Sequence, residues 1–178
     1  MDRRTFGTSM LVGAVGLAAA PALAQPGRMR APPMGDMAMG PAEQRHVEDT
    51  LMIGAVALQT SRLALSRGVR PLVRQFAEFE VEEQTTVAQI LGEISGMGPP
   101  PPAPADRRLL DRLERARGPA FEREYLLGQI DGHQRLLAVQ DRYLSSGRNR
   151  HHRHLAMLAR GRINEHLREL SLVRNFRG

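Results

Sequence analysis

The sequence predicts an all-α protein, an up-down four-helix bundle with a Pro-rich crossover and a short extra helix. In four long stretches, apolar residues recur every three or four positions, which is the period of one face of an α-helix. Proline and glycine residues lie near the ends of these stretches, where helices begin and end. Nothing in the chain shows the two-residue alternation of a half-buried strand. Aromatic residues make up only 4% of the chain, so we expect a mainly aliphatic core.

Residues 1–24 have the pattern of an export signal and are set apart from the fold. The charged start DRRTF at residues 2–6 is followed by an apolar run over 10–20 and an A-x-A cleavage pattern ending at Ala24. The paired arginines resemble a twin-arginine signal, and a general secretory signal is the alternative. We therefore expect cleavage after Ala24, a periplasmic location and no transmembrane segment in the mature chain.

The composition narrows the class of protein. Of the 178 residues, 154 remain after the signal, enough for one domain with a real core. No cysteine is present, so disulfides and thiolate metal sites are excluded. The net charge of +6 becomes +5 without the signal's one acidic and two basic residues. We expect no nucleic-acid binding, since an aromatic stacking platform is lacking, but the positive charge favours association with anionic envelope surfaces.

The first half of the mature chain is predicted to form an arm followed by a helical hairpin. Residues 25–40 are rich in Met, Pro and Gly and predict a flexible arm. A helix over about 41–67 follows, and a second over 71–95; each starts with a proline, which suits the first helical turn. The connection is short, so the two helices should pack antiparallel. The inward stripe expected for the second helix is Leu72, Phe76, Phe79, Glu83, Val87, Ile90 and Ile94.

A crossover over residues 96–118 links the two halves of the bundle. The segment GPPPPAP at 98–104 predicts a stiff polyproline stretch. Asp106 is expected to cap a short helix over 107–117. The chain therefore crosses the bundle before the next long helix begins.

Two long helices, over about 119–146 and 149–174, complete the predicted bundle. Asn149 is expected to cap the last one. The first of them carries His133 in an otherwise apolar seam, and the second carries His166 on its apolar stripe. Polar residues in such positions point to an interior site or to buried hydrogen bonds.

One run in the third long helix carries a family resemblance. The pattern FERxYxxxQIxxH over residues 121–133, with SRLAL at 61–65, VRQFA at 73–77 and NEHL at 164–167, resembles the family called domain of unknown function 4142. The resemblance extends over roughly 47–172. It implies an exported protein with a ferritin-like four-helix bundle, and it implies no settled biochemical role.

Ferritin-like di-metal sites take a Glu from each of two helices and a Glu-x-x-His pair from each of the other two. This chain has one such pair, Glu43-x-x-His46, at the very start of the first helix. The resemblance also implies Asp-His where this chain has Glu83-Gln84, and a Glu in the first helix where it has Ala57 and Gln59. These departures argue against a di-iron oxidase.

A smaller metal site is one hypothesis for the bundle interior. If the last two helices turn near residues 146–148, His133 lies within one turn of His166, and Glu83 can reach the same layer. One carboxylate and two imidazoles suit a single transition-metal ion. The alternative is that both histidines are core-edge residues held by hydrogen bonds, with Arg162 as the charge partner of Glu83.

Two other clusters are candidates for ligand binding. Met34, Met37 and Met39 in the arm carry thioethers that suit Cu(I); the alternative is a tail with incidental methionines. The run RNRHHRH at 148–154 could bind an anion or a metal, or gain charge in acid; the alternative is a solvated helix start.

Three functions remain open from the sequence. The first is a non-enzymatic, exported protein of the cell envelope, related to stress, that binds a ligand or partner. The alternative is a metal-binding or storage-type ferritin-like protein, with a transition metal as its cofactor. The third is a ferritin-like redox enzyme, which the missing Glu-x-x-His pairs disfavour. The sequence leans against an enzyme, since no hydroxyl lies at a suggestive spacing from a histidine and no phosphate-binding loop is present.

Overall fold

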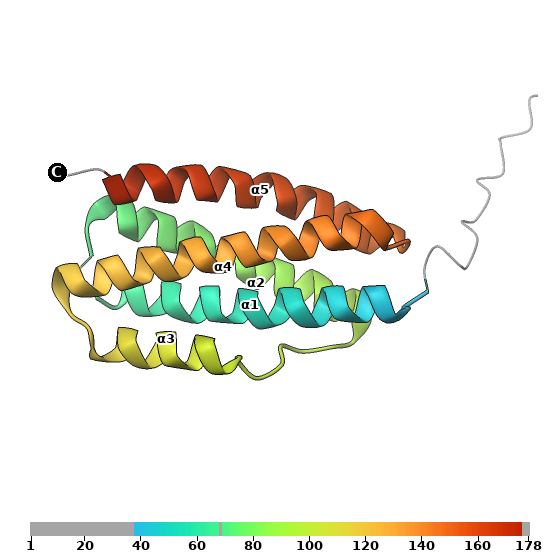
Figure 1. Ribbon diagram of the computed structural model, residues 1–178, viewed down its shortest axis with the longest axis horizontal. Helices are drawn as coiled ribbons and strands as arrows, with labels where there is room; N and C mark the ends of the chain where they lie inside the picture. The colour runs from blue at the N-terminus through green and yellow to red at the C-terminus, as the bar shows by residue number, and fades with distance from the viewer. Residues whose placement is uncertain (1–37, 68, 176–178) are drawn as a thin grey trace, which may run out of the picture. The chain divides into compact units, whose positions relative to one another are not determined.

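The computed structural model describes residues 38–67 and 69–175, which form a helical bundle (Figure 1). Within these residues lie five helices and no strand: α1 (Pro41–Leu65), α2 (Pro71–Ser95), α3 (Pro104–Arg115), α4 (Gly118–Ser146) and α5 (Arg150–Asn175). The predicted all-α bundle is thus confirmed. The export signal predicted at 1–24 and all but the end of the arm at 25–40 lie outside the described residues. Across the described part of the chain, no helix has the length and apolar character needed to span a membrane.

The four long helices pack side by side, and neighbours in the bundle run antiparallel (Figure 1). Along the chain, α2 and α4 run in the same direction, because the crossover returns the chain between them. The helices α1 and α2 form one hairpin, α4 and α5 form another, and the two hairpins join mainly through α1 and α4. The short helix α3 lies outside, against α1 and α4. The fourth side, between α2 and α5, has few close backbone contacts. A cavity of about 350 Å³ lies there, lined among others by Phe79, Glu83, Leu158 and Arg162.

The helix ends follow the sequence signals with one correction. Proline occupies the first turn of α1 and α2, and the left-handed backbone of Gly96 (φ 70°) ends α2. Asn149 caps α5 as predicted, because its Oδ1 accepts the backbone N–H groups of His151 and His152 at 3.0 and 3.3 Å.

The predicted cap of the short helix is wrong. That helix begins at Pro104, and its N-cap residue, Ala103, makes no side-chain cap. Proline already has the φ angle of a first helical turn, so the helix starts two residues before Asp106. The Asp106 carboxylate instead forms a bidentate ion pair with Arg135 of α4, with N···O distances of 2.6 and 3.1 Å. This pair fastens α3 to the bundle.

The core is built from three clusters of buried apolar side chains. The largest packs around Phe76 and Tyr125, near the turn between α1 and α2. A second surrounds Leu51 and Leu91, and a third surrounds Leu136 and Ile163. Several fully buried polar side chains interrupt this apolar packing, and they form the candidate sites.

The inward stripe predicted for α2 is partly wrong. Phe76 is fully buried, and Val87 and Ile94 pack against the core. The rest of the buried stripe is displaced by one position. The buried side chains of this helix are Val73, Phe76, Ala77, Glu80, Gln84 and Leu91. By contrast, Leu72, Phe79 and Ile90 are exposed. Both series have helical spacing and both contain apolar residues, so periodicity alone does not separate them.

Candidate metal centre

Three buried side chains from three helices converge on one point in the bundle. They are Glu80 of α2, His133 of α4 and His166 of α5, and each is at most 1% exposed. The Nε2 atom of His133 lies 3.0 Å from Nδ1 of His166. The Oε2 atom of Glu80 lies 3.3 Å from that Nε2 and 3.2 Å from that Nδ1. Two nitrogens and one oxygen therefore form a small triangle.

The protonation of His133 follows from its other ring nitrogen. Its Nδ1 atom lies 2.8 Å from the backbone carbonyl oxygen of Gln129, one helical turn earlier. A carbonyl only accepts, so Nδ1 carries the proton. The lone pair of the neutral ring is then on Nε2, which faces Glu80 and His166. This orientation is the one in which a second group fixes the tautomer of a metal-ligating histidine.

The Glu80 carboxylate is the least satisfied group in this cluster. Neither of its oxygens has a hydrogen-bond partner, although both imidazoles lie nearby. Burial by itself raises the pKa of the Glu80 carboxyl, but the neighbouring His133 and His166 outweigh burial and lower it to about 2. Glu80 is therefore ionised at neutral pH. A buried carboxylate whose nearest polar neighbours are two imidazoles costs free energy unless a cation or a proton compensates it.

The negative charge of Glu80 also changes the pKa of His133. Burial favours the neutral imidazole and lowers the pKa of His133, but the carboxylate of Glu80 outweighs burial and raises it. A proton and a metal ion would thus compete for the Nε2 atom of His133.

The far side of His166 meets a charged pair near the α2–α5 cavity. Its Nε2 atom lies 3.1 Å from the Nη2 atom of Arg162 and 3.6 Å from Oε2 of Glu83. Arg162 also donates from Nε to Glu83 at 3.1 Å. Because a guanidinium only donates, Nε2 of His166 accepts here and Nδ1 carries the proton. Metal binding through Nδ1 would require that proton to move to Nε2, where Glu83 is the nearest carboxylate.

Two of the three residues predicted for the interior metal site lie together in the structure, and the third does not. It brings His133 and His166 together, but Glu83 lies behind His166, beside Arg162, and does not reach the triangle. Glu80, one turn earlier on α2, holds the position expected for Glu83. The sequence signal for Glu80 is its place on the buried series with Phe76 and Ala77, which the one-position shift of the stripe concealed.

The predicted methionine cluster falls mostly beyond the described residues. Met34 and Met37 lie outside them. Met39 is partly buried and packs against the apolar cluster around Leu51 and Leu91. The Cu(I) site stays a prediction of the sequence.

A second buried polar cluster joins the start of α1 to the turn between α4 and α5. One oxygen of Glu43 accepts the hydroxyl of Tyr143 at 2.9 Å and the backbone N–H groups of Arg148 and Asn149 at 3.1 and 3.2 Å. The other oxygen accepts the N–H of Gly40 at 3.1 Å. Glu43 is thus fully hydrogen-bonded, and burial, which opposes ionisation, is outweighed by these donors, so the pKa of Glu43 falls to about 2.

Two histidines extend this cluster. Nε2 of His46 lies 2.8 Å from Oε1 of Gln140, and Nδ1 of His46 lies 3.2 Å from Nδ1 of His152. His152 comes from the run at 148–154, whereas His151 and His154 in that run are exposed. Since Glu43 already binds four donors, we interpret the cluster as a structural joint, and the pair Glu43-x-x-His46 as part of it.

The joint predicts an acid-sensitive fold. Burial, with the neighbouring His46, lowers the pKa of His152 from 6.5 to about 4, so the unfolded chain binds this proton more tightly than the folded protein. The contribution of neutral His152 to stability is therefore complete above about pH 6.5 and declines toward pH 4. We expect the drop in Tm between pH 7 and pH 4.5 to be smaller in His152→Gln than in the unmodified protein. Exposed His154→Gln is the control and should keep the full drop; equal drops in all three proteins would contradict the assignment.

Comparison with known proteins adds a family but no activity. A family model described as domain of unknown function (DUF4142) matches residues 28–172. No curated protein and no solved structure gives a significant match to the chain. The matched range includes all three residues of the candidate metal centre.

Proposed function

Because the chain belongs to the family described as domain of unknown function (DUF4142), which assigns no activity, we propose its function from the buried cluster: it binds one divalent transition-metal ion between α2, α4 and α5. The observation that carries this proposal is the fully buried Glu80 carboxylate. It has no hydrogen bond, yet it lies 3.2 and 3.3 Å from nitrogens of His166 and His133. A metal ion would bind all three and compensate the buried charge.

The spacing of the three donor atoms supports a metal of ordinary size. Bonds of 2.0–2.1 Å in a tetrahedral site place the donors about 3.3 Å apart. The three separations here are 3.0, 3.2 and 3.3 Å. Two imidazoles and one carboxylate suit Zn²⁺ and Fe²⁺, whereas Ca²⁺ and Mg²⁺ prefer oxygen donors alone.

One ion fits the donors better than two. In the part of the chain that the structure describes, Glu80, His133 and His166 are the one set of three such donors that converges. A di-metal site would need further carboxylates. The ion would be enclosed by side chains at most 1% exposed, with Arg162 and Glu83 between it and the α2–α5 cavity. Such enclosure suits retention of the metal, as in storage or delivery, more than turnover of a substrate.

Export is part of the same proposal. The pattern at residues 1–24 supports transport to the periplasm, and a folded metal-loaded chain would suit the twin-arginine route. The other candidate, an envelope protein that binds a partner without a metal, leaves a proton on His133, whose pKa Glu80 raises, to compensate the buried carboxylate.

Metal analysis of the protein as isolated from the producing cell, without chelators, tests the proposal. We expect close to one equivalent of a single transition metal. Titration of the metal-free protein with Co²⁺ should give one site with the visible spectrum of nitrogen and oxygen ligands. Less than a tenth of an equivalent, together with no Co²⁺ spectrum, would overturn it.

The affinity for the metal should depend on pH. The raised pKa of His133 means that its proton is held more tightly than in a free histidine, so competition should begin above pH 6.5. We expect Co²⁺ affinity to fall by about tenfold for each unit between pH 7 and pH 5. An affinity that stays constant over this range would show that no imidazole has to lose a proton.

A further inference from the structure

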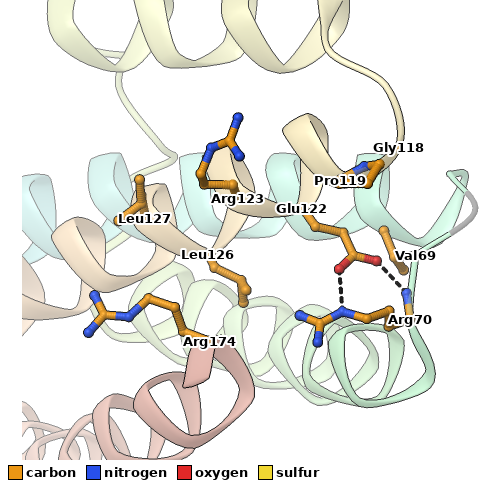
Figure 2. Close-up of a pocket in the computed structure, with 9 residues that line it drawn as sticks. All are labelled: Val69, Arg70, Gly118, Pro119, Glu122, Arg123, Leu126, Leu127 and Arg174. Atoms are coloured by element: carbon orange, nitrogen blue, oxygen red, sulfur yellow. Dashed lines mark hydrogen bonds and ion pairs between the residues drawn. The ribbon is translucent and has the colours of Figure 1, made fainter. Parts of the chain in front are cut away.

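A cavity of about 690 Å³ opens where the α1–α2 connection, the start of α4 and the end of α5 meet (Figure 2). Its volume lies in the range of small-molecule sites. Val69, Pro119, Leu126 and Leu127 give it apolar walls. It is separate from the metal centre, because none of the three donor residues lines it.

The glutamate that lines this cavity forms an ion pair, whereas two of the arginines that line it do not pair with any described residue. Both oxygens of Glu122 bind Arg70, one accepting its backbone N–H at 2.5 Å and the other its Nε at 2.6 Å. That carboxylate is therefore already neutralised. Arg123 and Arg174 also line the cavity, and neither makes an ion pair or a side-chain hydrogen bond with another described residue. In the view of Figure 2, Leu126 and Leu127 lie between these two arginines.

We infer that this cavity binds a single-chain amphiphilic carboxylate, with its head group at Arg123 and Arg174 and its alkyl chain against the apolar walls. Guanidinium groups pair well with carboxylates through parallel N–H···O bonds. A neutral amphiphile would leave both arginines without a partner. A small inorganic anion would leave the side chain of Leu127, which is 45% exposed, in water.

Calorimetric titration with decanoate, below its micellar concentration, tests this inference on the purified protein. We expect one site, with binding of 1-decanol and of decyltrimethylammonium at least about tenfold weaker. Arg123→Gln and Arg174→Gln should each weaken decanoate binding by about tenfold. Leu127→Asp, which places a negative charge on an exposed wall residue, should abolish it.

Two matched control variants test whether decanoate binds in this cavity rather than elsewhere on the protein. Arg168→Gln removes an exposed arginine of α5 that does not line the cavity, and it should leave decanoate affinity unchanged. The metal-centre variant Glu80→Gln should also leave it unchanged. The inference is overturned if 1-decanol binds as tightly as decanoate, or if the two cavity arginines have no effect. It is also overturned if binding appears only after residues 176–178 are deleted, since the chain's own end would then be the occupant.

Discussion

Replacing Glu80 with glutamine is expected to lower the affinity for a divalent transition metal by at least about a hundredfold, with the helical fold retained. The amide has nearly the same shape as the carboxylate but no charge, and its NH₂ group would face the imidazoles that the carboxylate now faces. Titration of the metal-free protein with Co²⁺ or Zn²⁺, beside circular dichroism, measures both effects. The metal-free variant should be at least as stable as the metal-free parent, because a fully buried charge has been removed.

Glu83→Gln is the matched control for this prediction. Glu83 lies behind His166, 3.6 Å from its Nε2 atom, and would hold that nitrogen's proton when Nδ1 binds the metal. Loss of such a supporting carboxylate typically costs about tenfold or somewhat more in affinity. If Glu83→Gln weakens metal binding more than Glu80→Gln, then Glu83 is the ligand and the assignment of Glu80 is wrong.

Replacing Arg162, unlike replacing Glu80 or Glu83, is not expected to weaken metal binding. Its Nη2 donates to Nε2 of His166 and so favours the tautomer in which Nδ1 is protonated. Arg162→Gln should therefore leave metal affinity unchanged or increase it. This comparison separates a residue that competes with metal binding from one that supports it.

The fold was predictable because its signals are local. Helix ends lie at Pro41, Pro71 and Gly96, and the apolar spacing between them needs no knowledge of distant residues. The contact between His133 and His166 was also predictable from the sequence, because a short turn makes the last two helices antiparallel. Register along one such hairpin follows from counting residues on either side of the turn.

The third ligand was not predictable in the same way. On α2, the apolar side chains of Leu72 and Phe79 are exposed. Because they have helical spacing, the sequence pattern places the buried stripe one position away from where it lies. The choice between Glu80 and Glu83 depends on the rotation of α2 about its axis. That rotation is set by packing against α1, which separates the two stripes only in three dimensions.

The buried polar cluster around Glu43 and His46 was also beyond prediction from the sequence, because its partners are distant along the chain. The hydrogen bond from Tyr143 to Glu43 spans 100 positions, and the contact between His46 and His152 spans 106. The first helix and the last connection must be docked before any of these partners meet. The sequence signals were present, as a Glu-x-x-His pair and a histidine-rich helix start, but each by itself is equally consistent with solvent exposure.

Phe76 links the stability of the core to the metal centre. Its side chain is fully buried in the largest apolar cluster. Its ring centroid lies 6.4 Å from that of Tyr125, 6.0 Å from that of His133 and 5.3 Å from that of His166. The ring therefore forms an apolar wall beside both imidazoles and limits the positions that they can adopt.

Phe76→Ala is expected to lower the free energy of unfolding by about 3–5 kcal/mol, because the lost burial is accompanied by a cavity that the helices cannot close. Urea denaturation of the metal-free protein measures this change. Phe79→Ala, three residues away on the same helix, is the control; this ring is 46% exposed and its removal should cost less than about 1 kcal/mol. Equal losses for the two variants would mean that α2 presents a different face to the core, and Glu80 would then no longer point inward.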